Sequence, residues 1–272
     1  MRSQIKILTL SYLTFLSFMI FTALFDGILS TIVYYLGFFA AISVGLGLYS
    51  GEEKIKIASV EYLRLDLRGA AATALVCAPT VAIVMGVSAL TSLLISATVG
   101  EVQTVTLDGR IWVDILLHAL LPALLEELLF RYLPLRVLSG GSRTCTVIIS
   151  AVFFACVHTS LFSIPYALVA GVIFMMVDIL ADSVIPSLII HLINNVCSIL
   201  WLYFSENAAF ADAYLITVLS LALVSLMVII LFGRGQIKRL FELMREGEKY
   251  VPSYEPLLFI IPTLVLAISE LV

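Results

Sequence analysis

The chain has 272 residues, of which 62% are hydrophobic and only 12% are charged, and its formal net charge is −4. A soluble domain typically has about half of its residues apolar and about a quarter charged. The composition therefore excludes an ordinary soluble protein and indicates an integral membrane protein, and the negative balance argues against binding to nucleic acid.

Apolar runs of about 20 residues, separated by short polar breaks, predict a polytopic bundle of transmembrane helices. The runs do not alternate between apolar and polar residues, which argues against a β-barrel. The third and fourth runs are long enough to tilt or kink. We expect an all-α fold with eight or nine spans, at 5–25, 28–49, 69–97, 111–138, 144–162, 164–181, 184–205, 211–232 and 257–272.

The breaks between the runs are too short to be domain linkers, so we expect one membrane domain over residues 1–272. The distribution of lysine and arginine predicts a multi-pass protein of the cell membrane with a cytoplasmic N-terminus. In that orientation Arg110 alone lies outside, Arg131 lies within the membrane, and the cytoplasmic basic residues are Arg2, Lys6, Lys54, Lys56, Arg64, Arg68, Arg136, Arg143, Arg234, Lys238, Arg239, Arg245 and Lys249.

Two breaks have the pattern of a helix that lies on the membrane surface. In residues 235–250, apolar residues share one helical face and basic residues occupy the others. Such a helix contacts membrane lipid through its apolar side. Residues 52–69 show a weaker version of the same pattern.

Most acids lie near span ends, where the membrane interface hydrates them, but one pair lies inside the fourth run, in the sequence EELLFR at 126–131. Charged groups within spans are costly and are usually functional. Glu127 and Arg131 are four residues apart, so they share a helical face and are expected to pair. Glu126 points roughly 100° away from that face, which makes it a candidate general base. The alternative is a structural ion pair with a second acid that another helix satisfies.

The fifth run contains a histidine, His158, in the sequence FFACVH, with Phe154 one helical turn before it. A histidine in a span is either a functional group or a packed core residue that is hydrogen-bonded. Phe154 is most simply a packing residue, and in a functional site it would shape the wall beside the imidazole.

The seventh run contains the sequence HLINN, in which His191 and Asn195 are four residues apart and face the same way. Asn194 lies near the same face. An imidazole beside a carboxamide provides either two metal ligands or a base with an oxyanion donor. The alternative is a pair that makes hydrogen bonds between helices. The remaining histidine, His118, lies one turn from Asp114, and we interpret that pair as structural or interfacial.

Together, Glu126-Glu127-x-x-x-Arg131, Phe154-x-x-x-His158 and His191-x-x-x-Asn195 resemble the three signature motifs of a family of intramembrane proteases. It is the CAAX-protease and bacteriocin-processing family, also called the CPBP or ABI family. The resemblance covers about residues 111–205, which is the expected catalytic core. It implies a helical bundle with an intramembrane polar cavity that hydrolyses a peptide bond in a membrane-associated or lipidated peptide or protein.

The resemblance also implies a role for each motif residue. Glu126 would activate water, His158 would bind or protonate the substrate, and His191 with Asn195 would stabilise the oxyanion. The supporting residues would be Glu127, Arg131 and Phe154. Many members of the family have glycine after the arginine, whereas this chain has Tyr132, which puts the choice of substrate in question.

A requirement for metal is left open by the resemblance, because family members are described both as metalloproteases and as enzymes that use a glutamate alone. Two histidines with a carboxylate resemble a catalytic zinc set, and the candidate ligands of a divalent metal such as zinc are Glu126, His158 and His191. Against a metal, the chain has no H-E-x-x-H helix. Preorganised donors can also stabilise an oxyanion without a metal.

Three alternatives compete with the protease interpretation. A non-catalytic scaffold or bacteriocin-immunity protein would retain the fold, but such relatives are expected to lose motif residues, and here all are present. A proton-coupled transporter is disfavoured because the chain shows no internal repeat. A cysteine protease that uses Cys156 is disfavoured because positions two apart on a helix, such as Cys156 and His158, face different ways.

Overall fold

The computed structural model describes residues 2–53, 61–63, 67–98, 107–158, 163–245 and 260–261. These residues are almost all helical and contain no β-strand, so the predicted all-α fold is confirmed. In chain order the elements are α1 (Arg2–Thr22), α2 (Gly27–Glu53), η1 (Glu61–Leu63), α3 (Leu67–Thr98), α4 (Ile111–Ile115), η2 (Leu116–Leu120), α5 (Leu121–Glu127), η3 (Leu128–Tyr132), α6 (Leu133–Val137), α7 (Arg143–Cys156), α8 (Ser163–Ala181), α9 (Ile185–Phe204), α10 (Ala208–Phe232) and α11 (Arg234–Met244).

Six helices of the described part are long and apolar enough to cross a membrane, namely α1, α2, α3, α8, α9 and α10. The chain is therefore a multi-pass membrane protein. The fourth predicted span, 111–138, is the unbroken helical run from α4 to α6. The fifth, 144–162, is shorter than expected because α7 ends at Cys156. The ninth, 257–272, lies almost wholly outside the described residues.

The run from α4 to α6 contains two π-helical turns, η2 and η3, and each turn is followed by a proline. Leu121 donates its N–H to the carbonyl of Leu116, and Leu133 donates to Leu128, so each bond spans five residues instead of four. Pro122 and Pro134 come next in the sequence. A proline ring clashes with the carbonyl four residues earlier and cannot donate to it, and a wider turn just before the ring relieves that conflict.

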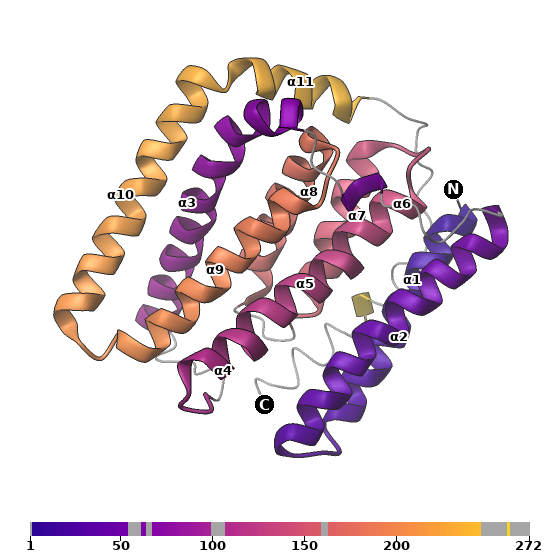
Figure 1. The fold of residues 1–272 in the computed structure, drawn as a ribbon, viewed down its shortest axis with the longest axis horizontal. Helices are drawn as coiled ribbons and strands as arrows, with labels where there is room; N and C mark the ends of the chain where they lie inside the picture. The colour runs from indigo at the N-terminus through magenta and orange to yellow at the C-terminus, as the bar shows by residue number, and fades with distance from the viewer. Residues whose placement is uncertain are drawn as a thin grey trace. The chain divides into compact units, whose positions relative to one another are not determined.

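The chain folds into two compact units. The first unit contains residues 1–64, 125–175 and 242–272. In it α1 and α2 pack side by side (Figure 1), and the Ser11 hydroxyl on α1 donates to the Ala41 carbonyl on α2. Gly45 on α2 allows α6 to come close, because a Cβ at that position would lie 2.6 Å from Cδ2 of Leu133.

Helices α7 and α8 also come very close within the first unit. A Cβ at Gly171 on α8 would lie 2.9 Å from the Cα of Ala151 and 3.2 Å from Cδ1 of Phe154. Small residues at such a crossing let two membrane helices approach to backbone contact. The position of the Phe154 ring therefore depends on the missing side chain of Gly171.

The second unit contains residues 65–124 and 176–241. Its helices α3 and α10 lie side by side (Figure 1), and α9 packs against α3 and the α4–η2 segment. A side-chain amide begins α10, because the N–H of Phe210 donates to Oδ1 of Asn207 at 3.2 Å. The single domain expected from the sequence stays a prediction.

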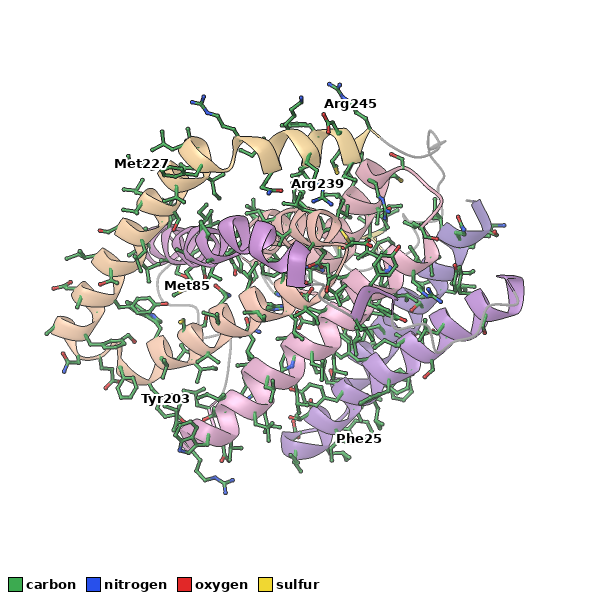
Figure 2. The ribbon with its side chains drawn as sticks, turned by 45° about the horizontal axis from the view of Figure 1, so that its top comes forward. Phe25, Met85, Tyr203, Met227, Arg239 and Arg245 are labelled. Atoms are coloured by element: carbon green, nitrogen blue, oxygen red, sulfur yellow. The ribbon has the colours of Figure 1, made fainter. Side chains whose placement is uncertain are left out.

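Helix α10 is apolar on every side, and most of its large side chains are exposed, such as Met227 at 60% (Figure 2). An apolar helix that is not covered by protein is typical of contact with lipid. The next helix, α11, covers the described part of the amphipathic segment expected from the sequence, and Arg239 extends from it (Figure 2). Its predicted position on the membrane surface stays a prediction.

Candidate active site

The acid pair and its arginine lie in the first unit, where α5 passes into η3. Glu127 is the last residue of α5, and its Oε2 lies 3.5 Å from Nε of Arg131, so the ion pair predicted from the spacing is present. Glu126, Glu127 and Arg131 are all buried, and Arg131 is completely enclosed. Tyr132, which stands where many family members have glycine, is buried as well.

Among the described residues, Arg131 is held by a carboxylate and by aromatic faces. Its guanidinium carbon lies 4.2 Å from the ring centre of Phe154 and 5.3 Å from that of Phe174. Within the described part of the chain, none of its three side-chain nitrogens has a hydrogen-bond partner. A cation over an aromatic face is attracted by the ring quadrupole, and more strongly where water is excluded. Phe154 therefore has a role beyond packing, and Phe174 was not singled out from the sequence.

His158 lies just past the C-terminal end of α7 and is partly buried, so it is not inside a helix as the predicted span implied. The last carbonyls of a helix lack intrahelical partners, and here the ring of His158 supplies one. Its Nδ1 lies 2.9 Å from the Phe154 carbonyl, and its ring meets the Phe154 ring edge-on at 4.9 Å. A carbonyl can only accept a hydrogen bond, so Nδ1 carries the proton and Nε2 is left for other chemistry.

Glu126 shares its surroundings with two tyrosines of the first unit. Its carboxylate lies within electrostatic range of the phenols of Tyr34 and Tyr35, which neighbour each other on α2. Phenols can donate hydrogen bonds to a carboxylate or to a water beside it. Neither tyrosine was singled out from the sequence, because nothing in the pattern of α2 connects it with the fourth run.

The third motif lies in the second unit, on the unbroken helix α9. His191 and Asn194 are buried, at 4% and 6% exposed, and Asn195 is half-buried. His191 and Asn195 are one turn apart, as the spacing predicted. The buried position of Asn194 makes it a second carboxamide on the inner side of this helix.

Two acids of the second unit are fully buried, one of which, Asp114, was interpreted with His118 as a structural or interfacial pair. Asp114 on α4 and Asp178 on α8 are both 0% exposed. Asp108 and Arg110, which precede α4, pair at the exposed edge, where Nε of Arg110 lies 2.6 Å from Oδ2 of Asp108. The hydrogen bond to this carboxylate, together with its charge, raises the pKa of Arg110. In this segment Asp114 is therefore shielded from water, whereas Asp108 and Arg110 are exposed.

The candidate metal ligands are divided between the units: Glu126 and His158 lie in the first, and His191 lies in the second. Among the described residues, no three histidine, cysteine or acidic side chains are grouped so that they would hold a metal ion.

These features define a class: a multi-pass helical membrane protein whose helices carry buried acids, a buried arginine and a buried histidine. Residues 108–197, which contain all three motifs, match the family model described as Type II CAAX prenyl endopeptidase Rce1-like. The match confirms, over this part of the chain, the resemblance found in the motifs, and at family level it supports a CAAX-type intramembrane endopeptidase. Neither the curated proteins nor the solved structures give a match.

Proposed function

We propose that the chain is an intramembrane endopeptidase that hydrolyses a peptide bond near a prenylated cysteine of a membrane-associated substrate. The observation that carries the proposal is the buried acid pair inside the matched segment, in which Glu127 pairs with Arg131 and Glu126 points to other partners. A carboxylate that is shielded from bulk water and lies near phenols, as Glu126 does, can hold and activate one water molecule.

In the proposed reaction Glu126 takes a proton from water as the oxygen attacks the scissile carbonyl. The carbonyl oxygen becomes an oxyanion, which His191 and Asn195 stabilise by donating hydrogen bonds. Collapse of the intermediate breaks the C–N bond. The leaving nitrogen takes up the proton that Glu126 removed, directly or through His158, and the products are a carboxylic acid and an amine.

The supporting residues hold this machinery in place. The cation of Arg131 neutralises Glu127 next to the general base, and the Phe154 ring contacts both the guanidinium and the ring of His158. With Nδ1 of His158 donating to the Phe154 carbonyl, Nε2 faces other groups and is the atom that binds or protonates the substrate. Geometry of this kind supplies much of the rate in enzymes, because errors of about 1 Å cost up to about 100-fold.

The substrate class is tested with a matched pair of peptides. The full chain is reconstituted in phospholipid vesicles and given a peptide that ends in C-a-a-X with a farnesylated cysteine, beside the same peptide with a free thiol. Mass spectrometry should show hydrolysis of the farnesylated peptide and little of its partner, and His191→Gln prepared in the same way should be much slower.

Equal cleavage of both peptides would refute the prenyl requirement. No cleavage by folded wild-type protein, over several C-a-a-X sequences and both prenyl lengths, would contradict the proposal and favour a non-catalytic scaffold or immunity protein. Equal rates for wild type and His191→Gln would show that the activity comes from a contaminant or from another site.

A further inference from the structure

Helix α9, which carries His191 and Asn195, is tied near its N-terminus to a buried acid of α8. The hydroxyl of Ser187 donates to Oδ2 of Asp178 at 2.7 Å, and the N–H of Ser187 donates to Oδ1 at 3.1 Å. Ser187 is one turn before His191. The Asp178 carboxylate therefore bonds both the side chain and the backbone of the first turn of α9, and a carboxylate there is also favoured by the helix dipole.

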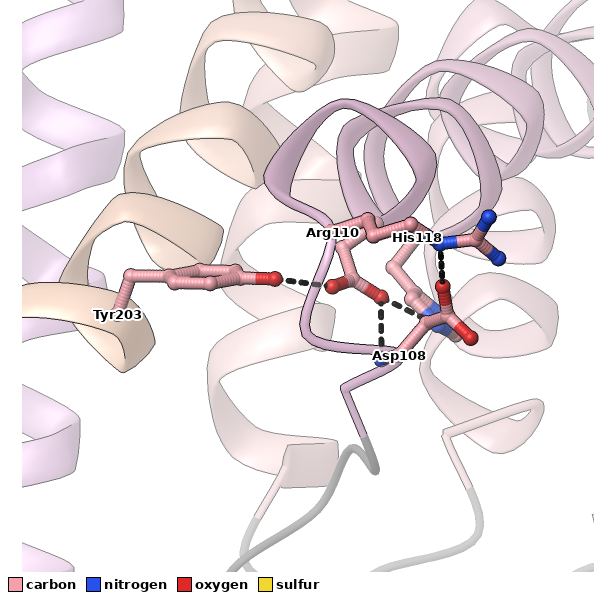
Figure 3. A network of polar contacts seen from close by, with 5 residues as sticks. Asp108, Arg110, His118 and Tyr203 are labelled. Carbon is pink, nitrogen blue, oxygen red and sulfur yellow. Dashed lines mark hydrogen bonds and ion pairs between the residues drawn. The ribbon is translucent and has the colours of Figure 1, made fainter.

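The same helix is tied near its C-terminus to a second buried acid, Asp114 of α4 (Figure 3). The Tyr203 hydroxyl donates to Oδ2 of Asp114. The other oxygen, Oδ1, accepts the backbone N–H of Asp108 at 2.9 Å and lies 3.7 Å from Nε2 of His118. The Asp114 carboxylate is therefore already held by Asp108 and His118 of its own segment, which makes its contact with Tyr203 rigid.

The Asp178–Ser187 and Asp114–Tyr203 contacts lie on different sides of α9. Ser187 and Tyr203 are 16 residues apart, and at about 100° per residue they differ by roughly 160° around the helix axis. One tie alone would allow α9 to rotate about that contact, whereas two ties on opposite sides fix both rotation and shift along the axis. His191 and Asn195 lie between them.

We propose that the Asp178–Ser187 and Asp114–Tyr203 ties form a clamp that sets the rotation of α9, with Ser187 and Tyr203 acting as positioning residues for His191 and Asn195. This inference rests on the proposed function. It assigns a reason for two buried acids that take no part in the chemistry. A clamped helix presents its oxyanion donors in one direction without reorganisation, which is the condition under which such donors are most effective.

Four variants separate the clamp from general damage. Ser187→Ala and Tyr203→Phe each remove one hydroxyl that bonds to a buried acid. Ser198→Ala and Tyr214→Phe are the matched controls: Ser198 bonds only the Asn194 carbonyl of its own helix among the described residues, at 3.0 Å, and no described residue bonds the hydroxyl of Tyr214. Ser187→Thr keeps the hydroxyl and should restore the behaviour of the wild type.

The first readout does not depend on activity. Cys197 lies on α9 between the ties and is half-buried, whereas Cys145 and Cys156 of α7 are buried. The rate at which a membrane-permeant maleimide labels each cysteine is followed by peptide mass spectrometry. In each clamp variant labelling of Cys197 should rise about fivefold, the shift that loss of one hydrogen bond gives to a conformational equilibrium. Labelling of Cys145 and Cys156 reports global unfolding and should not change.

The second readout is kinetic and uses the farnesylated peptide. Loss of the clamp should lower kcat about tenfold and leave KM within about twofold, because the oxyanion donors act mainly in the transition state. Ser198→Ala should match wild type in both readouts. Tyr214→Phe should match wild type in kcat and KM, and it is a control for the kinetic readout only, because the Tyr214 phenol lies within electrostatic range of Cys197. Labelling that changes while every protein, wild type included, is inactive would support the clamp and refute the proposed function. Unchanged Cys197 labelling in both clamp variants, or unchanged kcat with faster labelling, would overturn the positioning role.

Discussion

The Glu127–Arg131 pair and the Asp114–His118 pair begin from the same local pattern. Each places an acid and a base one turn apart, at 3.5 and 3.7 Å, beside a π-helical turn that precedes a proline. Their surroundings differ. Asp114 accepts hydrogen bonds from a backbone amide and from Tyr203, whereas the nitrogens of Arg131 face aromatic rings and have no hydrogen-bond partner among the described residues.

This difference separates a mechanical role from an electrostatic one. Neighbouring donors satisfy the Asp114 carboxylate, and its hydrogen bond with Tyr203 connects α4 with α9. Among the described residues no group forms a hydrogen bond with the nitrogens of Arg131. Its charge lies at a fully buried position beside a carboxylate and aromatic rings, where a low dielectric constant strengthens the interaction. The first arrangement suits a support, and the second suits a site where a neighbouring acid must react.

The largest effect is expected from breaking the buried ion pair. Arg131→Met keeps the length of the side chain but removes the cation beside Glu127, and breaking a buried pair in this way costs about 3–5 kcal/mol. The free energy of unfolding in mixed micelles should fall by that amount. Glu127→Gln in the same chain should recover most of the loss. Equal stability of Arg131→Met and wild type would contradict the pairing.

A smaller effect is expected where α7 meets the π-helical turn η3. Pro134 cannot donate to the Phe130 carbonyl four residues earlier, and the hydroxyl of Ser150 donates to it instead. Ser150→Ala should therefore cost about 1–3 kcal/mol, the penalty of a buried carbonyl that loses its donor. The loss should shrink in a Pro134→Ala background, because an N–H becomes available there. Additive losses in the double variant would argue against this link.

The aromatic support of Arg131 should contribute less than the ion pair. Phe154→Leu removes the ring that lies over the guanidinium and against His158, and a desolvated cation–π contact contributes about 2 kcal/mol. We expect a fall in stability of that order and a larger fall in kcat than in Phe153→Leu, whose ring packs against that of Tyr12 with ring centres 4.0 Å apart. Identical kinetics in the two variants would show that Phe154 only fills space.

The smallest effect is expected at the exposed edge of the Asp114 cluster. Arg110 pairs with Asp108 where both side chains are open to water, at 74% and 43% exposed. Surface pairs of this kind contribute little, and salt screens them. Arg110→Ala should leave both thermal stability and peptide cleavage at wild-type values. A marked loss in either would mean that the exposed pair holds Asp114 in place.

The fold and the local pairing could be predicted from the sequence because both depend on short-range patterns. Apolar runs of membrane length marked the spans, and a spacing of four residues was enough to pair Glu127 with Arg131. The resemblance to the family could be predicted as well, because three motifs in order are specific, and the family-model match over residues 108–197 agrees with it.

The surroundings of the site were not predictable, because they depend on contacts between distant segments. Phe174 on α8 contacts Arg131, and Tyr34 and Tyr35 on α2 lie within electrostatic range of Glu126. No periodic pattern in the sequence predicts either contact. Asp178 was passed over because an acid near a span end is usually hydrated, whereas here it caps the next helix. The end of α7 at Cys156 was missed because the apolar run continues beyond it.

The central claim is that Glu126, and not its neighbour, activates water. The direct measurement compares kcat on the farnesylated peptide for wild type, Glu126→Gln and Glu127→Gln, each in the same vesicles and each shown to be folded. Loss of a general base costs about 100- to 10,000-fold, so Glu126→Gln should lose activity by that factor. Glu127→Gln should keep more activity and lose more stability, since its carboxylate pairs with Arg131. A Glu126→Gln enzyme that cleaves at the wild-type rate would contradict the account.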